Sequence, residues 1–175
     1  MLDFETTGLI PDTGDRITEV TALRIVEGAI VERFVSMVNC RVSILYFITQ
    51  LTGISQAMVN GAPPLAEVMP ALLDFIGNDT LTSHNPSFDA KFLLAESASL
   101  HLQPRHNALI CALKLSRRLF LSIPSYKLGS LVTALRIPFH GTAHRAEADA
   151  EVSANLLLQV AQRLAFLARW FSQPA

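Results

Sequence analysis

Two adjoining stretches of strand-like sequence constrain the fold of this chain most strongly. Residues 16–26 and 29–38 alternate in the manner of β-strands and carry β-branched side chains throughout. Glu27-Gly28 stands between them and predicts the turn of an antiparallel hairpin. A strand-like segment around Asp3 precedes the hairpin, and helical patterns alternate with a short strand after it. This order predicts an α/β protein with a mixed sheet covered by helices.

The remainder of the chain gives helix and strand signals of different kinds. Residues 39–64 are expected to be rich in loops, with a short helical turn after Thr52-Gly53-Ile54. An amphipathic helix is predicted over 65–76, where Gly77-Asn78 stops it, and a short strand over 80–84. Further helices are predicted over 87–97, 110–119, 126–135 and 145–171. Three aromatic residues near the end of the last helix are expected to pack on the domain's own core, the alternative being a small exposed patch: Phe166, Trp170 and Phe171.

Length and composition indicate one cytoplasmic domain. The 175 residues fit a single domain over 1–175, and a hydrophobic content of 50% excludes a disordered chain. No apolar run approaches the ~18 residues of a membrane span, and no signal peptide precedes the first motif, so no membrane partner is expected. Cys40 and Cys111 fit a reducing compartment. The net charge of −1 disfavours long stretches of duplex as a partner but is compatible with a short nucleic-acid end.

The segment Asp3-Phe4-Glu5-Thr6-Thr7-Gly8 carries the strongest functional signal. On an extended strand Asp3 and Glu5 point to one face, while Leu2 and Phe4 point to the other, toward a core. Two carboxylates side by side repel each other, and a hard divalent cation such as Mg²⁺ or Mn²⁺ reverses that cost. The Thr-Thr-Gly turn adds hydroxyls and backbone N–H groups that suit a phosphate beside a metal. The alternative is a solvated strand end with two ordinary acidic residues.

Two further acids fall on predicted apolar helix faces. A buried stripe is predicted on the last helix, formed by Val152, Leu156, Val160, Leu164 and Leu167. One step back along this stripe lies Asp149, and Asp89 has a similar place in the first turn of its own helix. A buried carboxylate without a partner is costly, so metal ligation explains these acids at least as well as helix capping does. With Asp3 and Glu5 they make four carboxylates directed at the sheet.

Three segments line up in order and together resemble one nuclease family. They are residues 3–8, then His84-Asn85-Pro86-Ser87-Phe88-Asp89, then His144-Arg145-Ala146-Glu147-Ala148-Asp149. Their order and separations are similar to those of the DnaQ-like DEDDh 3′–5′ exonucleases, the family that includes the proofreading subunit of bacterial replicative DNA polymerases. The resemblance also covers residues 47–54 and 124–128, and therefore runs from residue 2 to about 160.

This resemblance implies an RNase H-like fold, α/β, with a mixed five-stranded sheet flanked by helices. It implies a metal-dependent exonuclease that removes nucleoside monophosphates from the 3′ end of single-stranded or frayed DNA. Asp3, Glu5 and Asp149 would hold one of two divalent cations, Mg²⁺ or Mn²⁺. Asp89 would support the second cation, which Asp3 would bridge to the first. His144 would be the general base, because its unperturbed pKa lies near working pH.

His144 and Asp149 can meet only if the helix begins after the histidine. Residues five apart on an ideal helix differ in direction by about 140°, so the two would not share a face within one helix. Gly141-Thr142-Ala143 supplies a loop just upstream. We therefore expect His144 to lie on the loop that precedes the last helix.

The resemblance also indicates a set of substrate contacts. They are Thr6, Thr7, Gly8, Thr52, Ile54, Asn85, Phe88, Lys127 and Arg145. The first three belong to the turn that would receive the 3′ end, and the next two to the segment against which the terminal base would rest. For Phe88 core packing is favoured over stacking on the nucleotide. Lys127 and Arg145 are either phosphate contacts or solvated charges, and His84 either orients the site or is structural.

The start of the chain and the shared motifs leave other possibilities open. Only Met1 and Leu2 precede Asp3, whereas family members carry several apolar strand residues there, so we expect a truncated first strand and a true start upstream. One alternative function is an exonuclease for RNA or oligoribonucleotides, and another is a nuclease-like module that binds without cleaving. The expected partners are 3′ ends of single-stranded DNA or RNA, with a DNA polymerase as a further candidate.

Overall fold

A three-stranded antiparallel sheet forms the N-terminal part of the protein. The computed structural model describes the backbone of residues 1–171 and the side chains of residues 1–168. Strands β1 (Leu2–Thr6), β2 (Ile17–Val26) and β3 (Ala29–Met37) lie in the order β1-β2-β3. Glu27 and Gly28 both adopt left-handed conformations, with φ of 51° and 83°, as a two-residue hairpin turn requires. The predicted hairpin is therefore confirmed.

The two remaining strands of the described chain form a separate sheet. Strands β4 (Leu81–Ser83) and β5 (Leu109–Cys111) pair in parallel. The strands thus divide into sets of three and two, and the predicted five-stranded sheet does not form as one hydrogen-bonded unit. β1 still lies beside β4. There the Phe4 N–H donates to Oδ1 of Asp89 at 3.2 Å, so a side chain takes up a backbone group that a continuous sheet would pair.

The helices lie near their predicted positions, with corrections at three places. In the described chain they are η1 (Pro11–Thr13, a 3₁₀ helix), α1 (Tyr46–Thr52), α2 (Gln56–Asn60), α3 (Leu65–Ile76), α4 (Pro86–Ser99), α5 (Ala112–Leu119), α6 (Leu128–Leu135) and α7 (Ala146–Phe171). The short helical turn predicted after Thr52-Gly53-Ile54 is α2, and α1, which ends before Gly53, was not predicted. The helix predicted from residue 110 begins at Ala112, because β5 precedes it and Cys111 Sγ accepts the Lys114 N–H. Helix α6 begins two residues later than predicted, since Lys127 is still extended.

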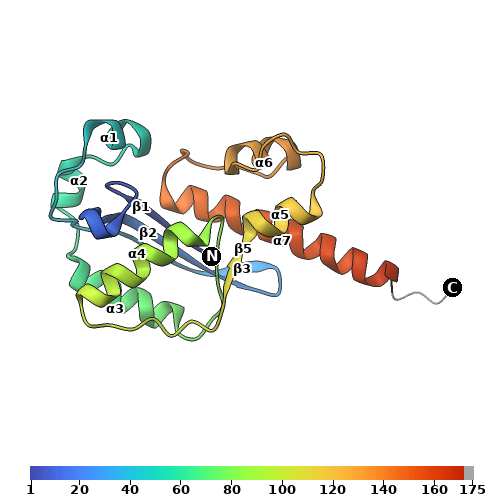
Figure 1. Ribbon diagram of the computed structural model, residues 1–175, viewed down its shortest axis with the longest axis horizontal. Helices are drawn as coiled ribbons and strands as arrows, with labels where there is room; N and C mark the ends of the chain where they lie inside the picture. Colours follow the sequence, from blue (N-terminus) through green and yellow to red (C-terminus); the bar gives the residue numbers. More distant parts are fainter. Residues whose placement is uncertain (172–175) are drawn as a thin grey trace.

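The three-stranded sheet separates two helical layers (Figure 1). On one face Leu2 and Phe4 share a core with α3 and α4, through residues such as Leu72 and Phe92. On the other face α7 packs on β1 and β2, while α5 and α6 pack on α7. Because successive residues of β1 point to opposite faces, the carboxylates of β1 lie on the α7 side.

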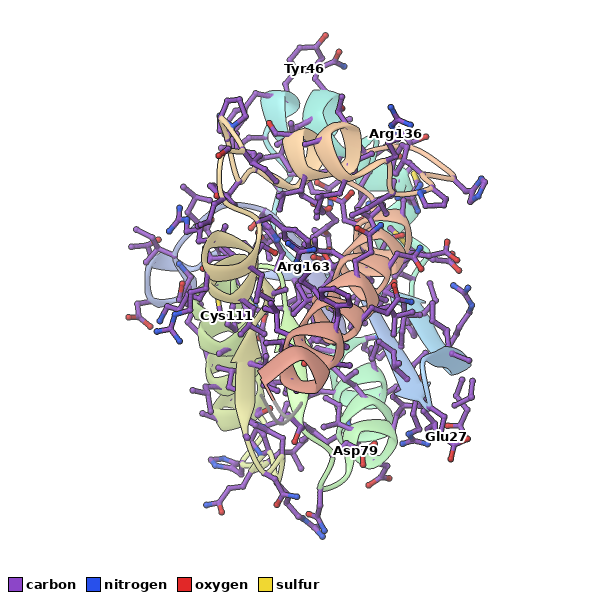
Figure 2. All side chains as sticks on the ribbon, turned by 90° about the vertical axis from the view of Figure 1, so that its right-hand side faces the viewer. Glu27, Tyr46, Asp79, Cys111, Arg136 and Arg163 are labelled. Carbon is purple, nitrogen blue, oxygen red and sulfur yellow. The ribbon has the colours of Figure 1, made fainter. Side chains whose placement is uncertain are left out.

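Helices α1 and α6 lie at the same end of the molecule in Figures 1 and 2. Tyr46, which is 78% exposed, projects from α1 at this end, and Arg136 lies at the end of α6. Leu131 of α6 is fully buried and shares a core with Val152 of α7. This contact holds α6 beside the first half of α7, where Asp149 is located.

The apolar stripe of α7 is buried over only part of its predicted length. Val152, Leu156 and Val160 are buried, whereas Leu164 and Phe166 are 45% and 56% exposed. In Figure 1 the second half of α7 extends past α5 and α6, the helices that bury its first half. The predicted burial is therefore wrong for Leu164 and Phe166, while the side chains of Trp170 and Phe171 lie outside the described residues. Of the helices that the structure describes, none is long and apolar enough to cross a membrane.

Candidate active site

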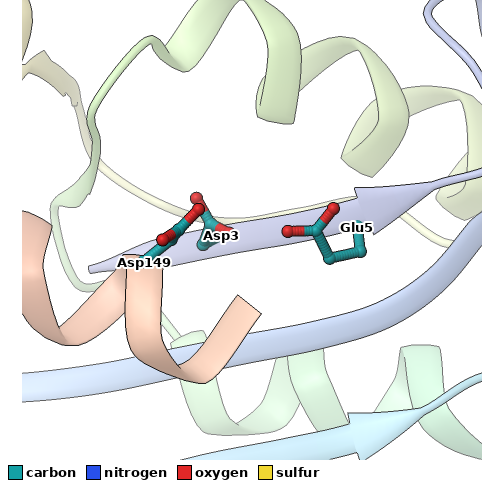
Figure 3. A group of neighbouring side chains, drawn as sticks. All are labelled: Asp3, Glu5 and Asp149. Carbon is teal, nitrogen blue, oxygen red and sulfur yellow. The ribbon is translucent and has the colours of Figure 1, made fainter. Parts of the chain in front are cut away.

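Three carboxylates from two distant parts of the sequence meet beside β1. Asp3 and Glu5 project from β1, and Asp149 projects from the first turn of α7 (Figure 3). One carboxylate oxygen of each residue lies within 4.8 Å of the other two. The alternation of β1 places the first two, and the packing of α7 on β1 brings the third. We call this group the carboxylate cluster; it contains three of the four acids that the sequence predicted at the site.

Burial and mutual repulsion make the cluster unfavourable for three negative charges. Burial raises the pKa of Asp3 well above its usual range, and the charges of Asp89, Glu5 and Asp149 raise it further. Burial first, then Asp149 and Glu19, raise the pKa of Glu5 to about 8. Among the described residues, no basic side chain forms an ion pair with the cluster. Oxygen ligands of this kind, close together and unpaired, fit a hard divalent cation.

Asp89 lies at the edge of the carboxylate cluster and not within it. Its side chain, in the first turn of α4, is 5% exposed and accepts the Phe4 N–H. Burial raises the pKa of Asp89 to about 6. Among neighbouring charges, that of Asp89 contributes most to the raised pKa of Asp3. The fourth predicted acid therefore interacts with Asp3, although its oxygens do not converge with the other three.

His144 lies just before α7, as the sequence predicted. Its backbone has φ of 59°, a left-handed conformation that is uncommon for residues other than glycine. The His144 N–H donates to Oδ2 of Asp149 at 3.3 Å. This turn brings the exposed histidine next to the carboxylate of the first helical turn.

A cavity of about 1030 Å³ opens beside these two residues. Its lining includes His84, Asn85, Lys127, His144 and Asp149. Asn85 and Lys127 are exposed there, so both are accessible to a ligand in the cavity. Burial lowers the pKa of the half-buried His84, which favours a neutral, structural imidazole. The cavity therefore extends from Asp149 of the carboxylate cluster to a wall that carries the positive charge of Lys127.

The Thr-Thr-Gly turn is held by its own side chains. Thr6 Oγ1 donates to the Gly8 carbonyl at 2.6 Å, and Thr7 Oγ1 accepts the Arg16 N–H at 3.0 Å. A Cβ atom on Gly8 would lie 2.3 Å from Oδ1 of Asp15, so a larger residue here would displace the carboxylate that accepts the Ile10 N–H. Both threonines are buried. Their hydroxyls thus shape the turn, and their contact with a 3′ end stays a prediction.

Three other predicted substrate contacts are less accessible. Ile54 is fully buried, and Thr52 is buried with its hydroxyl donating to a backbone carbonyl of α1. Phe88 is half-buried against the core that α4 shares with the sheet, in line with the packing role that the sequence favoured. The structure therefore brings Asn85 and Lys127 to the cavity and leaves these three side chains in or near the core.

Arg145 is engaged by a residue that sequence reasoning missed. Its guanidinium pairs with Glu19 of β2, whose side chain is 3% exposed. Nε of Arg145 lies 3.0 Å from Oε2 of Glu19, and Nη2 contacts Oε1. The available signal was a glutamate within the otherwise apolar and β-branched run 17–23. The role of Arg145 in binding phosphate stays a prediction, made in competition with this pair.

The sequence is similar to parts of bacterial DNA polymerase III. It is 35% identical to the PolC-type enzyme of Caldanaerobacter subterraneus over 164 residues, which are 94% of this chain and 12% of that protein. It is 30% identical to subunit epsilon of Aquifex aeolicus over 166 residues, which are 95% of this chain and 81% of that protein. The chain thus spans only a small part of the PolC-type relatives and most of the epsilon subunit.

Solved structures and a family model agree with these similarities. Exonuclease X in complex with 5′ overhanging duplex DNA has a TM-score of 0.74 and 26% identity, over 92% of this chain and 89% of that one. The nuclease domain of 3′hExo, a DEDDh family member bound to rAMP, has the same fold, with a TM-score of 0.77 and 22% identity over 92% and 90% of the two chains. The family model RNase_T, described as Exonuclease, matches residues 1–157. The chain therefore belongs to the exonuclease family, with the RNase H-like α/β fold of its DEDDh members.

Proposed function

We propose that this protein is a metal-dependent 3′–5′ exonuclease. Its substrate would be the 3′ end of single-stranded or frayed DNA, from which it releases nucleoside monophosphates. The observation that carries the proposal is the carboxylate cluster, in which Asp3, Glu5 and Asp149 offer oxygens within 4.8 Å of one another. Membership of the exonuclease family and the likeness to polymerase III subunits support the reaction class.

The cluster is suited to hold divalent cations, Mg²⁺ or Mn²⁺. Asp3, Glu5 and Asp149 would hold one ion, and Asp3 with Asp89 a second. When bound, such ions stabilise the attacking and departing oxygens of a phosphodiester hydrolysis. The raised pKa values of Asp3 and Glu5 support this assignment, because a cation would compensate the charges that burial and repulsion oppose.

His144 would act as the general base. Its imidazole is exposed at the cavity, on the loop just before the turn of α7 that carries Asp149. There a water next to the scissile phosphate could transfer its proton to the ring. The hydrogen bond from the His144 backbone N–H to the Asp149 carboxylate holds this loop against α7. The imidazolium formed would then face carboxylates, which favour its positive charge.

The cavity would bind the terminal nucleotide and the nucleotides that precede it. Lys127, which lines the cavity, would pair with a phosphate, and Asn85 would hydrogen-bond the terminal nucleotide. The Thr6-Thr7-Gly8 turn would receive the 3′ end through its backbone, and Arg145 would contribute positive charge nearby. RNA or oligoribonucleotides are the second candidate substrate, because the related 3′hExo domain was solved with rAMP. Association with a DNA polymerase and a location in the cytoplasm complete the proposal.

The test is hydrolysis of 5′-labelled single-stranded DNA and RNA of equal sequence, with Mn²⁺, with Mg²⁺ and with EDTA. We expect a ladder that shortens from the 3′ end, requires a divalent cation, and forms faster on DNA. A faster ladder on RNA would transfer the assignment to the second substrate. No cleavage by a folded sample that binds Mn²⁺ would contradict the proposal and favour a non-cleaving binding module.

A further inference from the structure

Glu19 is a buried acid that faces the carboxylate cluster from the neighbouring strand. In the β1–β2 register Glu19 stands directly opposite Glu5, so the two side chains share one face of the sheet. The side chain of Glu19 is 3% exposed. It is not one of the three residues whose oxygens converge. A second glutamate at this position adds repulsion and must therefore be stabilised by other contacts.

Those contacts all come from the start of α7. Oε2 of Glu19 accepts the Ala146 N–H at 2.9 Å and the Arg145 Nε–H at 3.0 Å, while Oε1 contacts Arg145 Nη2. Ala146 is the first residue of α7. The N–H groups of a helix's first turn have no partner within the helix. Glu19 thus caps the helix from another element and binds the preceding guanidinium in a two-pronged ion pair.

The capped turn is the one that carries the functional side chains. The Asp149 N–H donates to the Arg145 carbonyl at 3.0 Å, and the His144 N–H donates to the Asp149 carboxylate. A movement of Arg145 would therefore displace Asp149 relative to β1. Glu19 belongs to β2, which is hydrogen-bonded to β1 along the cluster, so it ties the two halves of the site to one sheet.

We propose that Glu19 is a positioning residue, which fixes the start of α7 so that Asp149 meets the two carboxylates of β1. The inference rests on the proposed metal site and adds a residue that supports the site without touching the ion. Glu19 acts through Arg145 and the helix terminus, and it does not ligate the cation. Its effect is on the affinity of the cluster for a divalent ion and, through that, on the rate of hydrolysis.

The chain contains a closely matched control for this ion pair. Glu96 of α4 is also 3% exposed and pairs with Arg16, whose side chain is 36% exposed, the same value as that of Arg145. Oε2 of Glu96 lies 2.7 Å from Arg16, and Oε1 accepts the backbone N–H of Ile17 at 3.3 Å. This pair joins α4 to the start of β2, and its hydrogen bonds and ion pair among the described residues do not involve α7. Glu96→Gln therefore measures the loss of a buried ion pair away from the carboxylate cluster.

The test compares Mn²⁺ affinity and turnover of 5′-labelled single-stranded DNA in Glu19→Gln, Arg145→Lys and Glu96→Gln. We expect Glu19→Gln to weaken Mn²⁺ binding, followed by electron paramagnetic resonance of the free ion, about 10- to 100-fold. Arg145→Lys retains both charges but removes the planar fork, so it should weaken Mn²⁺ binding as well. Glu96→Gln should lower the unfolding temperature and leave Mn²⁺ affinity as in the wild type.

Each outcome decides the inference. Wild-type Mn²⁺ affinity in both Glu19→Gln and Arg145→Lys would overturn it. Weaker Mn²⁺ binding in Glu19→Gln, with wild-type affinity in Arg145→Lys, would also overturn the inference. The lost negative charge near the cluster, and not a displaced start of α7, would then explain the effect. If Glu19→Gln does not fold, the affinity of Arg145→Lys decides. A wild type that binds Mn²⁺ without cleaving DNA would refute the proposed function, while the Mn²⁺ titrations would still test Glu19.

Discussion

The protein contains two groups of carboxylates withdrawn from solvent, and they differ in what surrounds them. Glu19 and Glu96 are each 3% exposed, and each has an arginine and a backbone N–H as partners. The carboxylate cluster is half-buried between β1 and α7, and none of its members has an ion-pair partner among the described residues. The paired glutamates connect elements of the fold. The unpaired cluster connects β1 to α7 through oxygens that repel one another.

The difference separates acids that serve the fold from acids that serve a ligand. A buried charge persists when its partners offset part of the loss of water. Burial raises the pKa of Glu96, and Arg16 and the Ile17 N–H act against that rise. In the cluster, burial and neighbouring acids raise the pKa of Glu5 to about 8, although the charge of Arg145 acts against the rise. A divalent cation would supply the positive charge that neutralises the three carboxylates. Substitution of a cluster member and substitution of Glu96 should therefore have opposite effects on activity and stability, whereas Glu19 supports the site through α7.

The largest effect is expected for Asp3→Asn. This change retains the shape of the side chain but removes a negative ligand oxygen, so hydrolysis of single-stranded DNA should fall to background. The metal-free protein should be at least as stable as the wild type, because the lost charge is one that burial and four neighbouring acids disfavour. Turnover and thermal unfolding without metal are the measurements. Wild-type turnover in Asp3→Asn would place the metal elsewhere.

A large effect on turnover alone is expected for His144→Asn. Asparagine tolerates the positive φ of this position, so the loop before α7 should persist. Loss of the general base should lower the rate about 100-fold or more. Mn²⁺ affinity should change much less, because the side chain of His144 is not part of the cluster. Equal losses of rate and of Mn²⁺ affinity would make His144 a ligand or a scaffold residue instead.

Glu96, the paired glutamate that is bound to Arg16 and Ile17 and not to α7, should behave in the opposite way. Glu96→Gln should destabilise the fold by about 2 kcal/mol, since Arg16 and the Ile17 N–H lose a charged acceptor. Turnover at a temperature where the variant is folded should remain that of the wild type. Urea unfolding and the DNA assay measure the two quantities. A drop in turnover with no change in stability would erase the distinction between the two groups.

The pH dependence of stability sharpens the comparison further. The folded-state pKa of Glu5 is raised from 4.5 to about 8, so the folded protein binds this proton more tightly than the unfolded chain. The stabilisation from this proton is present below pH 4.5 and is lost as pH rises toward 8, at up to about 1.4 kcal/mol per pH unit. Without metal the unfolding temperature should therefore fall over this window, and Mn²⁺ should restore it most strongly at alkaline pH.

Glu5→Gln is the control for this pH effect. It removes the titrating group, so the decrease in unfolding temperature over the same window should become shallower. Thermal unfolding at several pH values, with EDTA and with Mn²⁺, gives the comparison. An unchanged pH profile in Glu5→Gln would assign the effect to other groups.

Sequence patterns predicted the parts of the site that depend on local periodicity. The two-residue alternation of β1 places Asp3 and Glu5 on one face, and it holds in the structure. The helical stripe of α7 pointed to Asp149, and the angle between His144 and Asp149 required His144 to lie on a loop before the helix, as found. These features are set by a few neighbouring residues. They can be read without knowledge of the rest of the fold.

Features that depend on distant partners were missed. Glu19 appears in the sequence as one polar residue in a strand, and its importance arises from Arg145, which is 126 residues away. The Phe4 N–H is accepted by the Asp89 carboxylate, 85 residues away, where β1 lies beside β4 without pairing to it in one sheet. Leu164 continues the helical pattern of α7 but lies where α7 extends past its neighbours. In each case contacts with distant residues determine the structure, and the local sequence pattern does not predict those contacts.

A calorimetric titration with Mn²⁺ tests the central claim most directly. It would be performed on the wild type, Asp3→Asn and Glu96→Gln at the same pH, without nucleic acid. We predict binding in the wild type and in Glu96→Gln with the same affinity, and a severe loss in Asp3→Asn. Equal Mn²⁺ binding by all three proteins would contradict the claim that the unpaired carboxylates form the metal site.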